Sequence, residues 1–301
     1  MEFDKKAFST QANFHLAGLV PIAGQPLDFT LPYPDCLLPI APNYTLIEAA
    51  IIECAFAGCD TIWVVCNDDT APLVRHRVGD WIHDPIYFYY KQSQGKMNRR
   101  IPIFWVPIHP KDRDKRDCLS WSIIQGALSC LKISSHLSSW LIPEKYYVSF
   151  PYGVFDPRKL WDQRRLIKSS TNFYVTKDGK TMQDNYYTSF TFGKEEFVKY
   201  RRNIRKGTGR FTSKITDERG FPRHELPLEE RWSARFFELK DVFIDLDLPD
   251  ANLLKLDNFF NVGSWEQYIE FMSSEYVKTI KRPTGELFKY REFNRIGKDL
   301  E

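Results

Sequence analysis

The sequence Thr45-Leu-Ile-Glu-Ala-Ala-Ile-Ile-Glu-Cys-Ala-Phe-Ala-Gly-Cys-Asp-Thr-Ile-Trp-Val-Val-Cys66 joins an apolar run to a run rich in β-branched residues. Thr45 and Glu48 have the spacing of a capping box, so we expect a helix to begin at Leu46. Gly58 can supply the left-handed residue that commonly follows a helix. Together with an apolar run at 15–23, these residues predict a strand, a helix and a second strand, a βαβ unit with parallel strands.

Helical and strand patterns continue to alternate up to about residue 165. We expect helices at 74–81 and 120–133 and strands at 101–108 and 146–150. This alternation predicts an α/β fold with a mostly parallel, Rossmann-like sheet flanked by helices. Ligands of such folds bind at the carboxyl ends of the strands.

The later part of the chain has a different texture, which predicts antiparallel β structure. Segments at 172–176 and 184–192 flank Lys177-Asp178-Gly179-Lys180, in which Asp-Gly is a strong hairpin signal. A short helix at 195–202, a basic loop, a strand at 242–246 and a helix at 264–273 are expected to follow. We therefore divide the chain into a core at 1–165, a hairpin and basic-loop insertion at 166–235, and a return to the core with a charged tail at 236–301.

The composition fits a soluble globular protein, because 43% of the 301 residues are hydrophobic and the net charge is only +3, from 42 Lys and Arg and 39 Asp and Glu. No window approaches the ~18 apolar residues that span a bilayer, and residues 1–14 do not resemble a secretory signal. We expect a cytosolic protein without membrane contact. The six cysteines, all before residue 131, are expected to be buried reduced thiols. Aromatic residues reach 15%, which is the unusual feature of the composition.

Three segments, in the same order, resemble the sugar-nucleotide nucleotidyltransferases, which have a GT-A-type fold. Gly18-Leu-Val-Pro-Ile-Ala-Gly-Gln-Pro-Leu-Asp-Phe-Thr-Leu-Pro-Tyr-Pro-Asp-Cys-Leu-Leu-Pro-Ile40 is similar to the strand, phosphate loop and Pro-Lys segment that open that family. Ser149-Phe-Pro-Tyr-Gly-Val-Phe155 lies where the family has an Asn-Gly-Asp-Val strand end. Phe260-Asn-Val-Gly-Ser-Trp-Glu-Gln-Tyr268 is similar to the late Asp-Val-Gly-Thr-Pro-Glu-Asp-Tyr signature.

The resemblance implies a transfer reaction in which a sugar phosphate attacks a nucleoside triphosphate. It also implies a glycine-rich cradle, an Arg and a Lys on the phosphates, and two Asp residues on a divalent metal such as magnesium. Ala23 and Gly24 match the start of the cradle, but Asp28 falls where the family has its Arg, and Asp35 falls where it has its Lys. The two metal-binding Asp positions fall on Gly153 and Asn261.

These replacements suggest a fold that has been kept and a catalytic function that has been lost. A carboxylate facing a triphosphate repels it by on the order of 1 kcal/mol at ~4 Å in water, and by more in a closed site. Asn261 is a poor substitute for a carboxylate toward magnesium. Asp28 could alternatively be an exposed turn residue, and Asp156 and Asp257 are the alternative metal ligands.

Two further segments have both a functional and a structural interpretation. Arg116 and Ser120 resemble an Arg/Ser element that contacts nucleotide in the cytidylyltransferase branch, although we favour Ser120 as a helix cap. A basic run at 199–214 could contact a nucleic-acid backbone. We favour a solvated or partner-facing loop, because no aromatic residue is interleaved to stack bases. The candidate contacts of that run are Arg201, Arg202, Arg205, Lys206 and Arg210.

The favoured function is therefore a non-catalytic, nucleotidyltransferase-like structural or assembly component that needs no cofactor and whose partners are other protein chains. Divergent relatives of the nucleotidyltransferase family occur in the genomes of large tailed phages. By analogy, this implies a virion as an alternative location to the cytosol. Aromatic groups such as Tyr87-Phe88-Tyr89-Tyr90, Tyr186-Tyr187 and Phe259-Phe260 are interpreted as contact surface. The alternative is an active, atypical nucleotidyltransferase that uses magnesium and a nucleoside triphosphate to make a nucleotide sugar.

Overall fold

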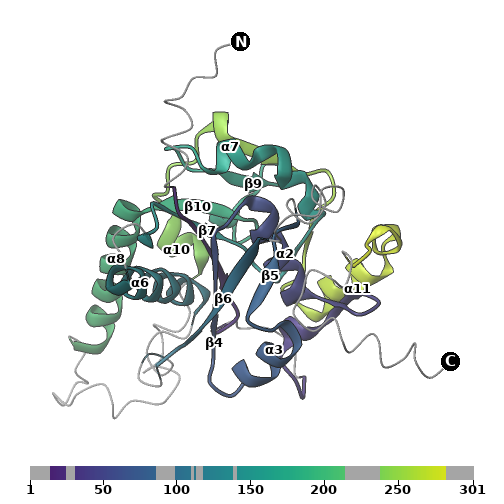
Figure 1. Cartoon of the computed structure of the whole chain (residues 1–301), viewed down its shortest axis with the longest axis horizontal. Helices are drawn as coiled ribbons and strands as arrows, with labels where there is room; N and C mark the ends of the chain where they lie inside the picture. The colour runs from purple at the N-terminus through teal and green to yellow at the C-terminus, as the bar shows by residue number, and fades with distance from the viewer. Residues whose placement is uncertain are drawn as a thin grey trace, which may run out of the picture.

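The computed structural model describes residues 14–24, 31–85, 99–109, 112, 118–137, 141–213 and 238–282, with only the backbone described for 205–213. Within this part, eight strands form one sheet in the order β11-β9-β10-β7-β1-β4-β6-β5 (Figure 1). The four central strands are parallel. They are β7 (Lys145–Val148), β1 (Leu16–Pro21), β4 (Thr61–Cys66) and β6 (Arg100–Pro107).

The predicted βαβ unit is confirmed. Strand β1 pairs with β4 in parallel, and helix α2 (Leu46–Ala57) connects them. The capping box forms, because the Thr45 amide donates to Glu48 Oε2 at 3.0 Å. Gly58 ends the helix at φ 88°, in the left-handed region that favours glycine.

Helices cover both faces of the sheet. Helices α6 (Leu119–Leu137), α8 (Lys194–Ser213) and α10 (Leu239–Phe243) lie on one side, and α2 and α3 (Ala71–Val78) lie on the other (Figure 1). Almost every residue of α2 is buried, because η3 (Pro157–Gln163) and α7 (Arg164–Ile167) pack on its outer side. The other described elements are η1 (Asp35–Leu37), β2 (Pro39–Ala41), β3 (Tyr44–Thr45), β5 (Trp81–His83), β8 (Gly153–Val154), β9 (Tyr174–Thr176), η4 (Met182–Asp184), β10 (Phe190–Gly193), η7 (Asp250–Asn252), β11 (Leu253–Lys255), β12 (Phe260–Asn261), α11 (Trp265–Ser273) and η8 (Glu275–Thr279).

Three sequence predictions for the later part of the chain are wrong. The expected strand at 242–246 is helix α10, in which Leu239, Val242 and Phe243 are buried with the spacing of a helix. The expected basic loop is the second half of α8, which is uninterrupted by proline and continues to Ser213. The expected strand at 184–192 is shortened to β10, which begins at Phe190, and Asp184 is the last residue of the short helix η4.

Most of the described aromatic side chains lie in the core, which the contact-surface interpretation did not expect. Tyr146 stacks on Phe192 with ring centroids 5.2 Å apart, and Phe243 lies edge-on against Tyr200 at 5.0 Å. These four side chains are buried. Of the groups interpreted as contact surface, Phe259 is buried, Tyr186, Tyr187 and Phe260 are half-buried, and the group 87–90 lies outside the described residues. The aromatic excess therefore mainly fills the core.

All six cysteines are buried and none forms a disulfide, as expected. Burial raises the pKa of the Cys36 and Cys130 thiols, so both are protonated at neutral pH. No helix in the described ranges is long and apolar enough to cross a membrane.

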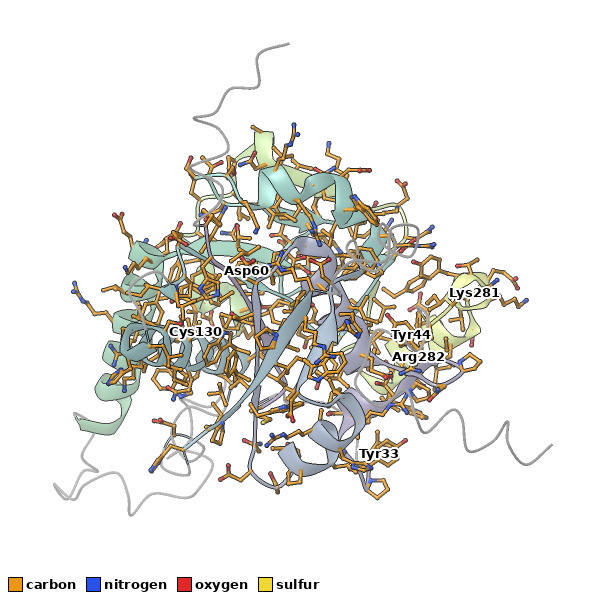
Figure 2. All side chains as sticks on the ribbon, viewed as in Figure 1. Tyr33, Tyr44, Asp60, Cys130, Lys281 and Arg282 are labelled. Carbon is orange, nitrogen blue, oxygen red and sulfur yellow. The ribbon has the colours of Figure 1, made fainter. Side chains whose placement is uncertain are left out.

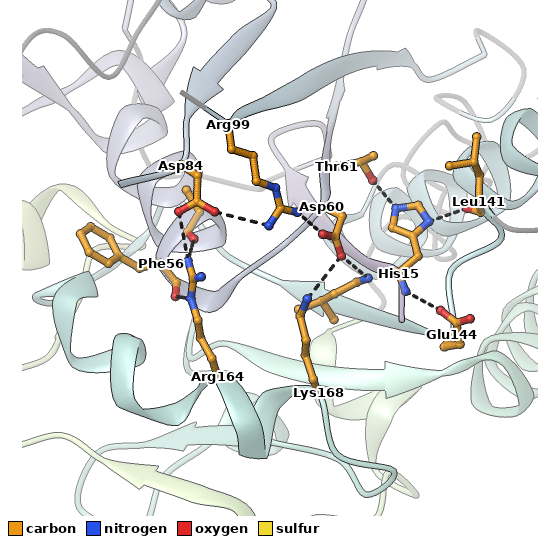
Figure 3. A network of polar contacts seen from close by, with 12 residues as sticks. His15, Phe56, Asp60, Thr61, Asp84, Arg99, Leu141, Glu144, Arg164 and Lys168 are labelled. Atoms are coloured by element: carbon orange, nitrogen blue, oxygen red, sulfur yellow. Dashed lines mark hydrogen bonds and ion pairs between the residues drawn. The ribbon is translucent and has the colours of Figure 1, made fainter. Parts of the chain in front are cut away.

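A network of ion pairs ties together the amino-terminal ends of the parallel strands (Figure 3). Asp60, just before β4, binds Arg99 and also Lys168 at 3.4 Å. Buried Asp84 binds Arg164 at 3.4 Å, and Arg164 donates to the carbonyls of Ala55 and Phe56 at the end of α2. A cation at the carboxyl end of a helix stabilises it. The network thus holds η3 and α7 against α2. It lies at the edge of the sheet opposite to the one where ligands are expected.

Lys145, in β7, is a second buried charge with a structural role. Its residue is 3% exposed, and its ammonium donates to the carbonyls of Ile167, Ser169 and Thr171. Burial lowers the pKa of Lys145 to about 8, so the side chain is mostly charged at neutral pH. It therefore fastens the loop at 167–171 to the centre of the sheet.

Glu53 is a buried carboxyl group in α2, and its residue is 3% exposed. Its Oε1 accepts hydrogen bonds from Tyr147, at 2.7 Å, and from Ser189. Burial raises the pKa of Glu53 from 4.5 to about 7, because a charge is poorly solvated there. The folded protein therefore favours the protonated acid more than the unfolded chain does.

We expect this carboxyl group to make stability fall as the pH rises. Its contribution is fully present below about pH 4.5 and is lost as the pH passes about 7, amounting to about 3 kcal/mol. Thermal unfolding from pH 5 to pH 8 should show a shallower decline for Glu53→Gln than for the natural chain. Glu270→Gln, on an exposed site of α11, is the matched control. Parallel pH profiles for the natural chain and Glu53→Gln would contradict the assignment.

Candidate functional site

The carboxyl ends of β1, β4, β6 and β7 meet at one edge of the sheet, which is where the resemblance places the phosphate cradle. Ala23 and Gly24 follow β1 there, and Gly24 has φ 75°. The Ala23 amide donates to Val65 O at 3.1 Å, and its carbonyl accepts from Ser122 Oγ at 2.7 Å. Ala23 is therefore fixed by the protein itself. Asp28 lies outside the described residues.

Asp35, at the position of the family's Lys, begins the short helix η1. Its Oδ1 accepts from the Cys36 amide at 3.1 Å and from the Tyr152 hydroxyl at 3.3 Å. Burial raises the pKa of the Asp35 carboxyl above its ordinary value, and its hydrogen bonds partly oppose that rise. This side chain supplies no positive charge for a phosphate.

Gly153 and Asn261 lie directly opposite each other. They are the two residues that the resemblance aligns with metal-binding Asp residues. They pair across the antiparallel strands β8 and β12. They are more than a hundred residues apart along the chain, and the structure brings them together. The landmarks on which the resemblance rests therefore converge on one place.

Tyr187 fills that place. Its amide donates to Asn261 Oδ1 at 2.9 Å, which uses the side chain that would face a metal. A Cβ added at Gly153 would lie 2.2 Å from the Tyr187 carbonyl oxygen, and one at Gly263 would lie 2.6 Å from the Tyr187 ring. Real Cβ atoms do not approach so closely, so a carboxylate cannot occupy position 153 in this arrangement. In the sequence, Tyr187 stands out only as an aromatic residue, because no local pattern indicates which distant segment it contacts.

The residues at this position do not fit a catalytic divalent cation. Magnesium takes oxygen ligands and relies on carboxylates together with substrate phosphates. Here Gly153 offers no side chain, and the Asn261 amide oxygen is already hydrogen-bonded. Among the described residues, no group of three His, Cys, Asp or Glu side chains could hold a metal ion.

The alternative metal ligands are engaged or remote. Asp156 caps η3, accepting from the Arg158 amide at 3.0 Å, and its carboxylate binds the Arg158 guanidinium at 2.8 Å. Burial tends to raise the pKa of Asp156, but the hydrogen bonds and charge of Arg158 outweigh it and lower the pKa. Asp257 is exposed. The structure therefore gives Asp156 a structural partner and leaves Asp257 on the surface.

The remaining candidates have other surroundings. Ser120 is not the cap of α6, which begins at Leu119; it is buried, and its hydroxyl donates to Glu238 O at 3.4 Å. Arg116 lies outside the described residues. Arg202 is exposed on α8 and Arg201 is half-buried. Only the backbone of α8 is described at Arg205, Lys206 and Arg210.

Comparison with solved structures agrees with this architecture. The chain is similar to the UTP-bound UGPase of Acinetobacter baumannii, with a TM-score of 0.50, 12% identity, and coverage of 96% of this chain and 100% of that one. A UDP-glucose pyrophosphorylase of the same organism gives a TM-score of 0.48 and 11% identity, with 96% and 100% of the chains covered. A UDP-glucose pyrophosphorylase complexed with UDP-glucose gives 0.47 and 14%, with 88% and 100% covered. The sequence matches no protein-family model and no curated protein. The likeness at 0.50 concerns the fold, and the mixed α/β class predicted from the sequence is confirmed.

Proposed function

Because the chain has the fold of the sugar-nucleotide nucleotidyltransferases, we propose that it is a non-catalytic protein of that fold, which works by binding as a structural or assembly component. The observation that carries this proposal is the Tyr187 carbonyl, 2.2 Å from where a Cβ of residue 153 would lie. Nucleotidyl transfer builds up charge that a metal and cationic side chains must neutralise in place. Neither metal position here carries a carboxylate.

The charge on the cradle side supports the same proposal. Asp35 stands where a phosphate site needs a cation, and it is held there by Tyr152 and the backbone. Its carboxyl group becomes harder to ionise through burial, which reduces its repulsion of phosphate but cannot turn it into attraction. The described part of the cradle thus lacks the electrostatic features expected of a triphosphate site.

The direct test is a turnover assay of the full chain with magnesium, each of four nucleoside triphosphates and a panel of sugar phosphates. We expect no pyrophosphate release above the protein-free rate, because the metal positions are occupied by the protein itself. Pyrophosphate release that disappears in Asp156→Ala and persists in Asp162→Ala would overturn the proposal in favour of an active nucleotide-sugar enzyme. Asp162 is the matched control because it is exposed on the same short helix, η3.

The assembly part of the proposal has its own test. Sedimentation of the purified chain, and of extracts from cells that produce it naturally, should place it in particles larger than a monomer. A chain that remains monomeric in both would contradict an assembly role without restoring a catalytic one.

A further inference from the structure

A cavity of about 410 Å³ lies outside the cradle, between residues 40–44, Phe56 near the carboxyl end of α2, the segment 154–159 and residues 276–282. Small-molecule sites commonly enclose roughly 300–1,000 Å³. Ala23, Gly153, Tyr187 and Asn261 do not line it. Figure 2 shows Tyr44 and Arg282 close to each other in this region, with Lys281 nearby. The cavity is therefore separate from the site formed by Gly153, Asn261 and Tyr187.

The inner wall of the cavity is apolar and firmly packed. Ile40, Tyr44, Phe56, Val154 and Phe155 line it, and each is buried. These residues come from segments on both sides of α2, so the wall is fixed by the core. It gives the cavity an apolar side.

Tyr44 places an unused hydrogen-bonding group in this wall. The residue is only 3% exposed. Within the described ranges, nothing hydrogen-bonds to its hydroxyl. Burial and the nearby carboxylates of Glu48 and Asp156 raise the pKa of Tyr44, so the hydroxyl keeps its proton and can donate it. An acceptor on a molecule bound in the cavity can therefore receive a hydrogen bond from this hydroxyl.

The rim of the cavity is cationic. Arg158, Lys159, Lys281 and Arg282 line it, against the single carboxylate of Asp156. Arg158 is paired with Asp156 and Arg282 with Glu48, both at 2.8 Å. Lys159 and Lys281 are exposed, and no carboxylate in the described part of the chain pairs with them. Two ammonium groups thus remain available to a ligand.

We propose that this cavity is a binding site for a small organic anion, whose flat apolar body lies against the wall around Tyr44 and whose anionic group is held by Lys159 and Lys281. A phosphate ester of an aromatic alcohol is the simplest molecule of this class. The Tyr44 hydroxyl donates to an oxygen of the bound molecule. The site does not depend on whether the chain transfers nucleotides, because Asp156 is the one lining residue that is also a candidate metal ligand, and the proposed contacts come from Tyr44, Lys159 and Lys281.

Calorimetric titration of the full chain with 1-naphthyl phosphate tests the proposal. We expect saturable binding that is at least about tenfold tighter than that of 1-naphthol or of inorganic phosphate. The first of these probes lacks the anionic group, and the second lacks the apolar body. The double variant Lys159→Ala/Lys281→Ala should weaken binding about tenfold or more, and Tyr44→Phe should weaken it about threefold to tenfold.

The matched control removes the same charge elsewhere. Lys278→Ala/Lys132→Ala changes two exposed lysines that do not line the cavity. This variant should bind 1-naphthyl phosphate as the natural chain does. Equal affinity in the two double variants, 1-naphthol binding as tight as that of its phosphate, or the absence of saturable binding would each overturn the proposal. A negative turnover assay would leave all of these outcomes unaffected.

Discussion

Gly153→Ala is expected to lower the unfolding temperature by about 6–12 °C. The new Cβ would lie 2.2 Å from the Tyr187 carbonyl oxygen, and this is a backbone atom that cannot rotate away. Forcing the two segments apart would also break the hydrogen bond from Tyr187 to Asn261 and disturb the β8–β12 pair. We estimate a loss of about 3 kcal/mol, and each kcal/mol lowers the transition by about 2–4 °C in a protein of this size class.

Gly193→Ala is the matched control for this experiment. Gly193 is also a strand residue, but a Cβ there would meet only Glu196 Oε2, at 3.2 Å, which is the end of a side chain and not a backbone atom. We expect its transition to fall much less, as measured by calorimetry or circular dichroism. If the two glycine variants unfold at the same temperature, Tyr187 does not occupy the position beside Gly153.

Lys145→Met is expected to produce the second large loss, about 3 kcal/mol of unfolding free energy at pH 7. Methionine keeps most of the apolar stem but leaves the carbonyls of Ile167, Ser169 and Thr171 without their common donor. Buried acceptors without a partner cost about 1–3 kcal/mol each, and removal of a poorly solvated ammonium offsets part of that cost.

Urea unfolding would measure this loss directly. Lys132→Met, on the exposed side of α6, is the control, and it should change stability by less than about 0.5 kcal/mol. A Lys145→Met variant as stable as Lys132→Met would mean that the loop at 167–171 is held by other contacts.

The first half of the fold could be predicted because its local signals agree with its tertiary structure. At Thr45, Glu48 and Gly58, capping and a left-handed turn mark the ends of α2 regardless of what packs on it. The Asp178-Gly179 turn is likewise confirmed, with both residues at positive φ. The late helix α10 was missed because a short apolar segment such as 242–246 fits both the helical and the strand period of hydrophobic residues. Only the segments that pack against it determine which structure forms.

The candidate site could be predicted only in part, for a related reason. The landmarks singled out Gly153 and Asn261, and the structure pairs these two residues across β8 and β12. The sequence could not show that Tyr187 contacts both positions, because these contacts depend on how three distant segments pack. The cationic cavity was missed for the same reason, since Tyr44, Lys159 and Lys281 are far apart along the chain.

The outer covering of α2 also determines the order in which the chain can complete its fold. Glu48, near the start of that helix, is buried and bonded to Arg282, a residue 234 positions later. Contacts of such long range form slowly, because a long stretch of chain must be ordered before they can close. During synthesis, α2 therefore emerges long before its last partner does. Until residue 282 is made, one flank of this highly apolar helix stays open to misfolding or to capture by a chaperone.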